Sequence, residues 1–429
     1  MAPSRHRLIL VGIVTASALG QLVVLRRYFD DSVVNAISPT SIDTEDYWLR
    51  AQLLLDGRFS EAFGDAYRMP GYSALIAVTD LLTPHPLLVV RLLQVLAIAG
   101  AAVCAGHVVR RATAHDRLAL LTTAAVAFYP PFWYLGPLLY AEAFTVLGVG
   151  VLLVLCAGFG DRASPGRLVG LGVTLAVLTY LKPNNVVLLL PVAVFLLVRL
   201  GRTRALVVAV AVAGAVLAGL IVPWSVAVTA SQDRLVLLST NNGYTFYRGS
   251  GVWLPSEDSL PRTVAIRLGL ADAQRDAMIK TRGFAMPRGA EADAYWRGEG
   301  MRAWRDEPSR TALYAGSKIA HSLGFSFGGL ADFILAAVSL AGAAAAFVLL
   351  RLRRHLAWAA FTAGTFVAMA LQVALYVPDV RFRVSLLDLP LLVLVALASA
   401  SLLRERRETP ERAIASRTAA NASSGPRPT

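Results

Sequence analysis

The apolar residues of this chain fall in long blocks separated by short polar connections, rather than in narrow stripes at helical spacing. Blocks of about 18 to 24 residues have the length that an α-helix needs to cross the hydrocarbon core of a bilayer. The pattern predicts an all-α polytopic membrane protein with about ten transmembrane helices. The expected spans are residues 8–25, 86–107, 118–136, 138–159, 168–182, 183–200, 205–229, 328–350, 355–376 and 386–403.

The first of these blocks follows a basic triplet and contains an Ala-Ser-Ala that a signal peptidase could accept, so a cleaved signal peptide is the competing interpretation. We favour a retained helix, because the apolar run continues past that tripeptide to a spanning length.

Short basic connections predict the orientation of the helices. If the spans alternate in direction, five basic connections fall on one side: residues 110–117, 160–167, 199–204, 351–355 and 404–407. The positive-inside rule makes that side cytoplasmic. We therefore expect a multi-pass plasma-membrane protein with both termini in the cytoplasm.

The same alternation places two long segments, residues 26–85 and 230–327, on the extracytoplasmic side of the membrane, and we expect them to carry the active site. Within the first, residues 70–84 are apolar but too short to span, which predicts an interfacial helix on the outer leaflet. We expect residues 1–403 to form a single transmembrane domain. The polar tail, residues 404–429, is expected to be a disordered cytoplasmic segment.

The composition narrows the function classes. The formal net charge is +13, but Lys and Arg sit mostly between apolar blocks, where they orient helices, so nucleic acid is not an expected partner. Cys104 and Cys156 both lie inside apolar blocks, so the loops carry no disulfide framework. The chain also lacks a Walker loop and a His-Glu-x-x-His motif. Any catalysis should therefore use carboxylates, phenols and cations.

The stretch "SIDTEDYWLR" concentrates acid in the first outer segment. On a helix, Asp43, Tyr47 and Arg50 share one face, with Asp46 beside them, while Glu45 points elsewhere. Acidic residues also stabilise the first turn of any helix, with Ser41 as a candidate N-cap. A catalytic acid and an ordinary helix start both remain open from this stretch alone.

Cations and one further acid are expected at the same membrane surface. Arg68 precedes Pro70, Lys182 interrupts an apolar run, and both Arg381 and Arg383 lie at the outer end of the last helix. Glu142 lies about one helical turn inside the membrane, where an acid is costly and by default a candidate for function. Structural pairing of Glu142 and snorkelling of Lys182 are the alternatives. A carboxylate base with several cations suits transfer from a lipid-linked phosphate donor.

Several motifs in order resemble the GT-C superfamily of membrane glycosyltransferases, and within it the dolichyl-phosphate-mannose-protein mannosyltransferase-like family. They are "D-x-x-x-Y" from Asp43, "YR-x-PGY" from Tyr67, "YAEA" (140–143), "LKP" (181–183), "LSTNNGYTFYRGSG" (238–251) and "RFRVSLLDLP" (381–390). The resemblance spans nearly all of residues 5–403.

The resemblance implies a GT-C fold and transfer of a sugar, usually with inversion, from a polyprenyl-phosphate donor to a hydroxyl acceptor on the extracytoplasmic face. It implies Asp43 as the catalytic base, Arg68 and Lys182 as cations at the donor phosphate, and Asn241 and Asn242 as residues that cap the site. The family's adjacent acidic pair is here a spaced set, so Asp46 remains the alternative base. The acceptor class (glycan, lipid or protein) stays open.

The substrate-binding residues expected beside the base are Tyr47, Tyr67, Arg68, Glu142, Lys182, Asn241, Asn242, Arg381 and Arg383. Carboxylates with phosphate also suit magnesium, but the family contains metal-independent members, so neither a cofactor nor a metal is expected. A transporter or flippase of a lipid-linked or anionic substrate is the main alternative function, and a non-catalytic scaffold the third.

Overall fold

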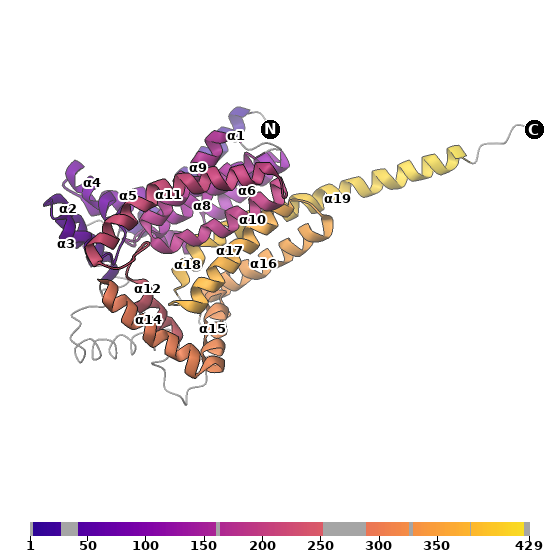
Figure 1. The fold of residues 1–429 in the computed structure, drawn as a ribbon. Helices are drawn as coiled ribbons and strands as arrows, with labels where there is room; N and C mark the ends of the chain where they lie inside the picture. The colour runs from indigo at the N-terminus through magenta and orange to yellow at the C-terminus, as the bar shows by residue number, and fades with distance from the viewer. Residues whose placement is uncertain are drawn as a thin grey trace, which may run out of the picture.

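The computed structural model describes residues 3–26, 42–159, 164–251, 289–325, 329–377 and 379–423, and these residues form helices and no strand. Most of the long helices lie side by side in a bundle (Figure 1). They are α1 (Pro3–Leu25), α5 (Pro86–Thr113), α6 (Asp116–Ala127), α8 (Glu142–Ala157), α9 (Pro165–Leu181), α10 (Leu189–Leu200), α11 (Arg204–Gln232), α16 (Leu330–Leu352), α17 (Leu356–Leu375) and α19 (Asp388–Ser423).

Six helices of the described chain are long and apolar enough to cross a bilayer, and a bent pair makes a seventh if it counts as one span. Residues 183–200, in which the 3-10 helix η2 (Pro183–Leu188) leads into α10, form one of the six. The bent pair is α18 (Val380–Leu386) with the start of α19, which meet at 45°. The chain is therefore a multi-pass membrane protein built from helices.

Two of the ten expected spans are clearly shorter than predicted, and a third, α9, is longer than predicted but still falls below spanning length. Residues 118–136 break into α6 and α7 (Pro130–Leu135), because Pro130 and Pro131 follow Tyr129 and hold its backbone extended, with ψ 112°. Residues 138–159 and 168–182 correspond to α8 and α9, of 16 and 17 residues. Six of the ten expected spans, or seven with the bent pair, are therefore long enough to cross a bilayer, whereas α6, α8 and α9 fall below that length.

The two long predicted loops fold into shorter helices at one end of the bundle, which we call the α2 end (Figure 1). The first contributes α2 (Ile42–Leu55), α3 (Phe59–Phe63) and α4 (Gly71–Leu82), and the second contributes α12 (Asn242–Ser250), α14 (Gly289–Asp306) and α15 (Pro308–Ser322). At 12 residues, α4 is only about 18 Å long and exposes Val78, Leu81 and Leu82, which fits the interfacial helix expected there.

The basic connections meet at the opposite end of the bundle, which we call the basic end. Arg111, Arg167, Arg199 and Arg353 line one cavity there, and Arg5, His115 and Arg404 line another. The alternation expected from the charge pattern is therefore present in the fold, with the start of α1 and Arg404 at the same end.

Small residues allow α5 to pack on several sides at the centre of the bundle. Ala97, Ala101 and Ala105 are buried along it, and a Cβ added at Gly150 of α8 would lie 3.0 Å from the Cβ of Cys104. Close helix contact through small residues is the usual way that membrane helices associate, since apolar side chains gain little by leaving lipid.

Over the described residues, the C-terminal tail continues helix α19. Helix α19 leaves the bundle and continues to Ser423 (Figure 1), while residues 424–429 lie outside the described residues. Ala, Arg and Glu favour helix formation, and Arg404 Nε lies 2.7 Å from Glu408 Oε1 one turn later. Polar composition excludes a packed core here but does not exclude an isolated helix.

Candidate functional site

Acids and cations from five separate segments meet at the α2 end. They come from α2, from the turn between α3 and α4, from the first residue of α8, from the junction of α9 with η2, and from the start of α18. The residues are Asp43, Asp46, Arg50, Asp65, Arg68, Glu142, Lys182, Asp379 and Arg381. We call this set the charged cluster.

Helix α2 presents its acids to Arg68. The guanidinium of Arg68 pairs with Asp43, its Nε lies 2.9 Å from Asp46 Oδ2, and its Cζ lies 4.8 Å from the centre of the Tyr47 ring. Glu45 of the same helix is exposed. The sequence expectation that Asp43, Asp46 and Tyr47 share one face is therefore confirmed, and Arg68 lies on that face.

The two candidate bases differ in accessibility. The Asp43 side chain is 37% exposed, whereas that of Asp46 is 2% exposed and also lies 3.2 Å from Arg50 Nε. Burial raises the pKa of the Asp43 carboxyl, but the charges of Arg68 and Arg381 outweigh this effect and hold its pKa well below the usual range. Asp43 is thus an ionised acid that a second molecule can reach, and Asp46 is a buried partner of two arginines.

The second half of the charged cluster joins Glu142, Lys182 and Arg381. Glu142 begins α8, and its Oε1 lies 2.6 Å from Lys182 Nζ and 3.9 Å from Arg381 Nη1. Arg381 also pairs with Asp379, and its Nη2 lies 3.6 Å from Asp43 Oδ2. Arg381 therefore connects the acid of α2 with the acid of α8.

Aromatic rings enclose these cations. Lys182 Nζ lies 4.0 Å from the centre of the Phe382 ring, Arg381 Cζ lies 4.1 Å from the Tyr140 ring, and Arg68 Cζ lies 5.4 Å from the Tyr67 ring. Burial raises the pKa of Tyr47 and of Tyr67 to about 12, so both phenols stay neutral at physiological pH. The rings attract the cations without neutralising them.

A close backbone contact holds the first loop against α9. A Cβ added at Gly71, the first residue of α4, would lie 2.6 Å from the carbonyl carbon and oxygen of Tyr180. Only glycine fits so close to another backbone. The contact places Gly71, three residues after Arg68, against Tyr180, two residues before Lys182. Gly71 of the "YR-x-PGY" motif therefore has a packing role in assembling the charged cluster.

The second loop docks on the first through Thr240. Its backbone nitrogen donates to the Ala66 carbonyl at 2.9 Å, and its hydroxyl donates to the Asp65 carbonyl at 2.8 Å. Asn241 follows with a buried side-chain oxygen that has no hydrogen-bond partner among the described residues, and Asn242 lines a cavity beside Pro183. The asparagines are thus next to the charged cluster rather than part of it.

Arg383 lies apart from the other expected residues. It is fully buried, its Nη2 donates to the Leu335 carbonyl at 2.9 Å, and its Nε lies 2.9 Å from Asp388 Oδ1 as an ion pair rather than an aligned hydrogen bond. Tyr129 donates its hydroxyl to the other Asp388 oxygen at 2.8 Å. Because Arg381 and Arg383 are two apart on a helix, they point to different sides, and Arg383 belongs to the interior of the bundle.

Asp65 and Asp379 complete the charged cluster but are not among the predicted residues. Asp65 accepts from both terminal nitrogens of Arg50 at 2.8 and 3.0 Å, and Asp379 caps α18 by accepting from the Arg381 nitrogen at 2.9 Å. A carboxylate at a helix start, two residues before an arginine, was the sequence signal for Asp379. Among the described residues, no three His, Cys, Asp or Glu side chains group as a metal site would require.

Comparison with known proteins found no matching family model, no matching curated protein and no matching solved structure. The charged cluster therefore has to be interpreted from its own geometry.

Proposed function

We propose that this protein is a glycosyltransferase that moves a sugar from a polyprenyl-phosphate donor to an acceptor hydroxyl, with Asp43 as the base. The observation that carries the proposal is the meeting of Arg68 and Arg381 at the accessible Asp43 carboxylate at the end of a membrane bundle. Lys182 lies beside them, joined to Arg381 through Glu142. The GT-C resemblance of the sequence motifs supports it. The proposal assigns the α2 end to the extracytoplasmic side, because the basic end then obeys the positive-inside rule.

The chemistry follows from the charges. The Asp43 carboxylate takes the proton of the acceptor hydroxyl, whose oxygen attacks the anomeric carbon of the donor. The bond from that carbon to the lipid phosphate oxygen breaks, and the phosphate leaves with the electron pair. Arg68, Lys182 and Arg381 stabilise the charge that develops on the leaving phosphate. A single displacement of this kind inverts the anomeric configuration.

An apolar cavity beside the charged cluster suits the donor lipid. Its volume is about 350 Å³, and it lies between η2 with α10 and the end of α17, starting at Pro183, the residue after Lys182. Val187, Leu190 and Leu371 line it, together with Asn242. A prenyl chain in this cavity would bring its phosphate to Lys182.

Lys182 should be needed for donor binding rather than for folding. Replacing Lys182 with methionine and Glu142 with glutamine together removes the ion pair without leaving a buried charge, so the double variant should fold. Loss of a charged contact of about 1.5 to 3 kcal/mol should raise the donor KM about ten- to hundredfold. Steady-state kinetics with labelled donor checks this, and Lys182→Arg should retain most of the binding because it keeps the charge.

If that double variant bound donor normally, the Lys182–Glu142 pair would be structural only.

The pH profile should reflect the cations around Asp43. In the free protein they lower its pKa, so Asp43 stays ionised and kcat/KM should not fall on the acid side down to about pH 5. When donor is bound, its phosphate competes with Asp43 for Arg68 and Arg381. The pKa of Asp43 then rises toward the ordinary aspartate value of about 4. The acid limb of kcat should therefore lie at higher pH than that of kcat/KM. An acid limb of kcat/KM above about pH 6 would indicate a different base.

A transporter or flippase is the second candidate. The break of 45° between α18 and α19, next to Arg381 and the buried pair of Arg383 with Asp388, resembles the discontinuous helices of transporters. We rank it second because the charged cluster lies at one end of the bundle and not midway along it. Movement of a labelled lipid-linked sugar across vesicles without any covalent product would favour this function.

The test in cells is mass spectrometry of lipid-linked sugars and surface glycans in a strain that lacks this protein. A glycosyltransferase predicts accumulation of one polyprenyl-phosphate sugar together with loss of one glycan product. Unchanged pools of both would contradict the proposal.

A further inference from the structure

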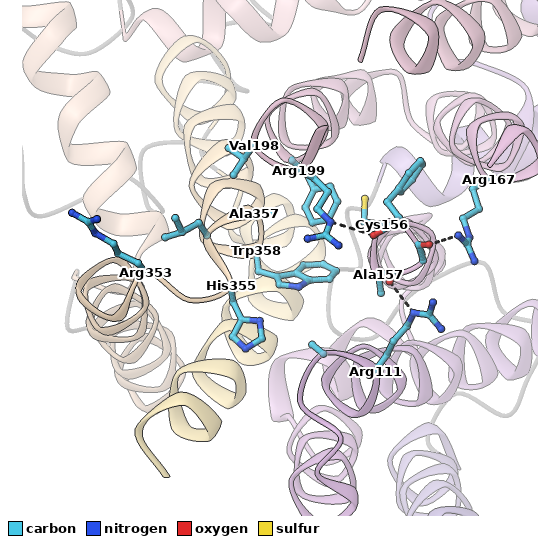
Figure 2. A pocket seen from close by; sticks show the side chains of 15 residues that line it. Arg111, Cys156, Ala157, Arg167, Val198, Arg199, Arg353, His355, Ala357 and Trp358 are labelled. Carbon is cyan, nitrogen blue, oxygen red and sulfur yellow. Dashed lines mark hydrogen bonds between the residues drawn. The ribbon is translucent and has the colours of Figure 1, made fainter. Parts of the chain in front are cut away.

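A second polar region lies at the basic end, at the opposite end of the bundle from the charged cluster. A cavity of about 1070 Å³ opens there between the ends of α5, α8 and α10 and the connection from α16 to α17. Figure 2 shows Arg111, Arg167 and Arg199 around the end of α8, with Trp358 and His355 beside them and Arg353 directed away. We call the three converging side chains the arginine triad.

The arginine triad binds three consecutive carbonyls at the end of α8. Arg111 Nε donates to the Ala157 carbonyl at 2.8 Å, and Arg199 Nε donates to the Phe159 carbonyl at 3.2 Å. Arg167 donates to the Gly158 carbonyl between them. The three guanidinium groups come from three different helices, α5, α9 and α10, so their convergence depends on the tertiary fold.

The positive charge of the triad exceeds what α8 can balance. The end of a helix carries about half a negative charge, against three positive charges here. The nearby ion pairs join Arg110 to Asp116 and Arg354 to Glu408, and among the described residues no carboxylate pairs with the triad. Each guanidinium has five N–H donors, of which one is used on α8, so donors remain for an anion.

Apolar side chains continue from the triad toward the lipid-facing surface. Val198 and Leu356 line the same cavity and are 45% and 38% exposed, and Trp358 lies beside them. Orientation by the positive-inside rule requires basic residues at this end but does not require that they gather in one cavity with an apolar edge. A phosphate headgroup with its acyl chains has both properties, charge at one end and apolar surface at the other.

We propose that the arginine triad binds the headgroup phosphate of an anionic phospholipid in the leaflet at the basic end. Basic pockets between membrane helices are known to hold such headgroups. The proposed site is separate from the charged cluster and does not depend on the reaction carried out there. A bound lipid would also tie α5, α9 and α10 together around the end of α8.

Native mass spectrometry of the full chain, delipidated in a neutral detergent, tests the proposal with phosphatidylglycerol and phosphatidylcholine as probes. The wild type should retain one phosphatidylglycerol at least tenfold more tightly than phosphatidylcholine. The variant R111Q/R199Q should lose that preference. The control R202Q/R204Q removes the same charge at the same end, from residues that do not line the cavity, and should bind within twofold of the wild type.

Two further arms keep the outcome interpretable. R111K/R199K keeps the charge and should retain most of the preference, which separates ligand binding from a folding defect in the glutamine variant. Inorganic phosphate at millimolar concentration should not displace the lipid. Equal loss in both glutamine variants, absence of a preference for the anionic lipid, or displacement by inorganic phosphate would each overturn the proposal.

Discussion

Replacing Asp43 with asparagine is expected to lower the turnover number of sugar transfer by about a hundred- to ten-thousandfold, the usual contribution of a positioned general base. Asparagine has nearly the same shape but cannot accept the proton of the acceptor hydroxyl. The donor KM should stay unchanged or fall, because Arg68 and Arg381 lose the carboxylate that competes with the donor phosphate for them. Initial rates with labelled polyprenyl-phosphate sugar, measured as a function of donor concentration, separate the two effects.

Glu45→Gln is the matched control for this experiment. Glu45 lies on the same helix, carries the same charge and is exposed away from the charged cluster, so its loss should leave both constants within about twofold, as for most surface substitutions. Equal activity of the Asp43→Asn variant and the wild type would remove Asp43 as the base. Asp46→Asn would not settle the same question, because Asp46 is buried between Arg50 and Arg68 and its loss should affect folding.

The largest loss of stability is expected from Asp388→Leu. This change leaves the fully buried Arg383 without its anion and Tyr129 without its acceptor. Breaking a buried ion pair from one side typically costs about 3 to 5 kcal/mol, because the remaining charge stays out of water. The temperature at which half of the protein in detergent is unfolded should fall by several degrees or more, as expected for a loss of this size. Thermal denaturation of the purified protein measures it.

The double variant Arg383→Met with Asp388→Leu distinguishes the loss of the whole ion pair from the loss of one partner, which leaves the other charge buried. It removes both charges, so it should recover most of the stability that the single change loses. If Asp388→Leu were as stable as the wild type, the pair would not hold α18 and α19 in their bent arrangement. Activity of the double variant should be close to that of the wild type, since Arg383 does not reach the charged cluster.

Most members of the charged cluster, although not Asp65 and Asp379, were predictable because a charge in or beside an apolar block carries a cost that the sequence makes visible. An acid in an apolar block, as at Glu142, or a lysine that interrupts one, as at Lys182, needs a partner. Helical spacing placed Asp43, Asp46 and Tyr47 on one face. What spacing could not give is which cation meets which acid, since Arg68, Lys182 and Arg381 reach the cluster only through tertiary packing.

Arg383 illustrates the limit of reading a motif residue by residue. It lies two positions after Arg381, and the two look equivalent in "RFRVS". Only the bundle decides that one faces the charged cluster and the other faces Asp388, a residue that the sequence pattern placed simply at the start of a span. Similarly, hydropathy overestimated the length of two helices, α6 and α8. The span over residues 118–136 breaks because Pro130 and Pro131 interrupt an apolar run without changing its hydropathy.

The most direct test of the central claim is transfer by the purified full chain in proteoliposomes that contain a polyprenyl-phosphate sugar with a labelled sugar, together with a pool of candidate hydroxyl acceptors. We expect the label to move covalently from the lipid to one acceptor in the wild type, with unlabelled polyprenyl phosphate released, and to remain on the lipid with the Asp43→Asn variant. Label that stays on the lipid with the wild type, whether or not it crosses the membrane, would contradict the assignment of a glycosyltransferase.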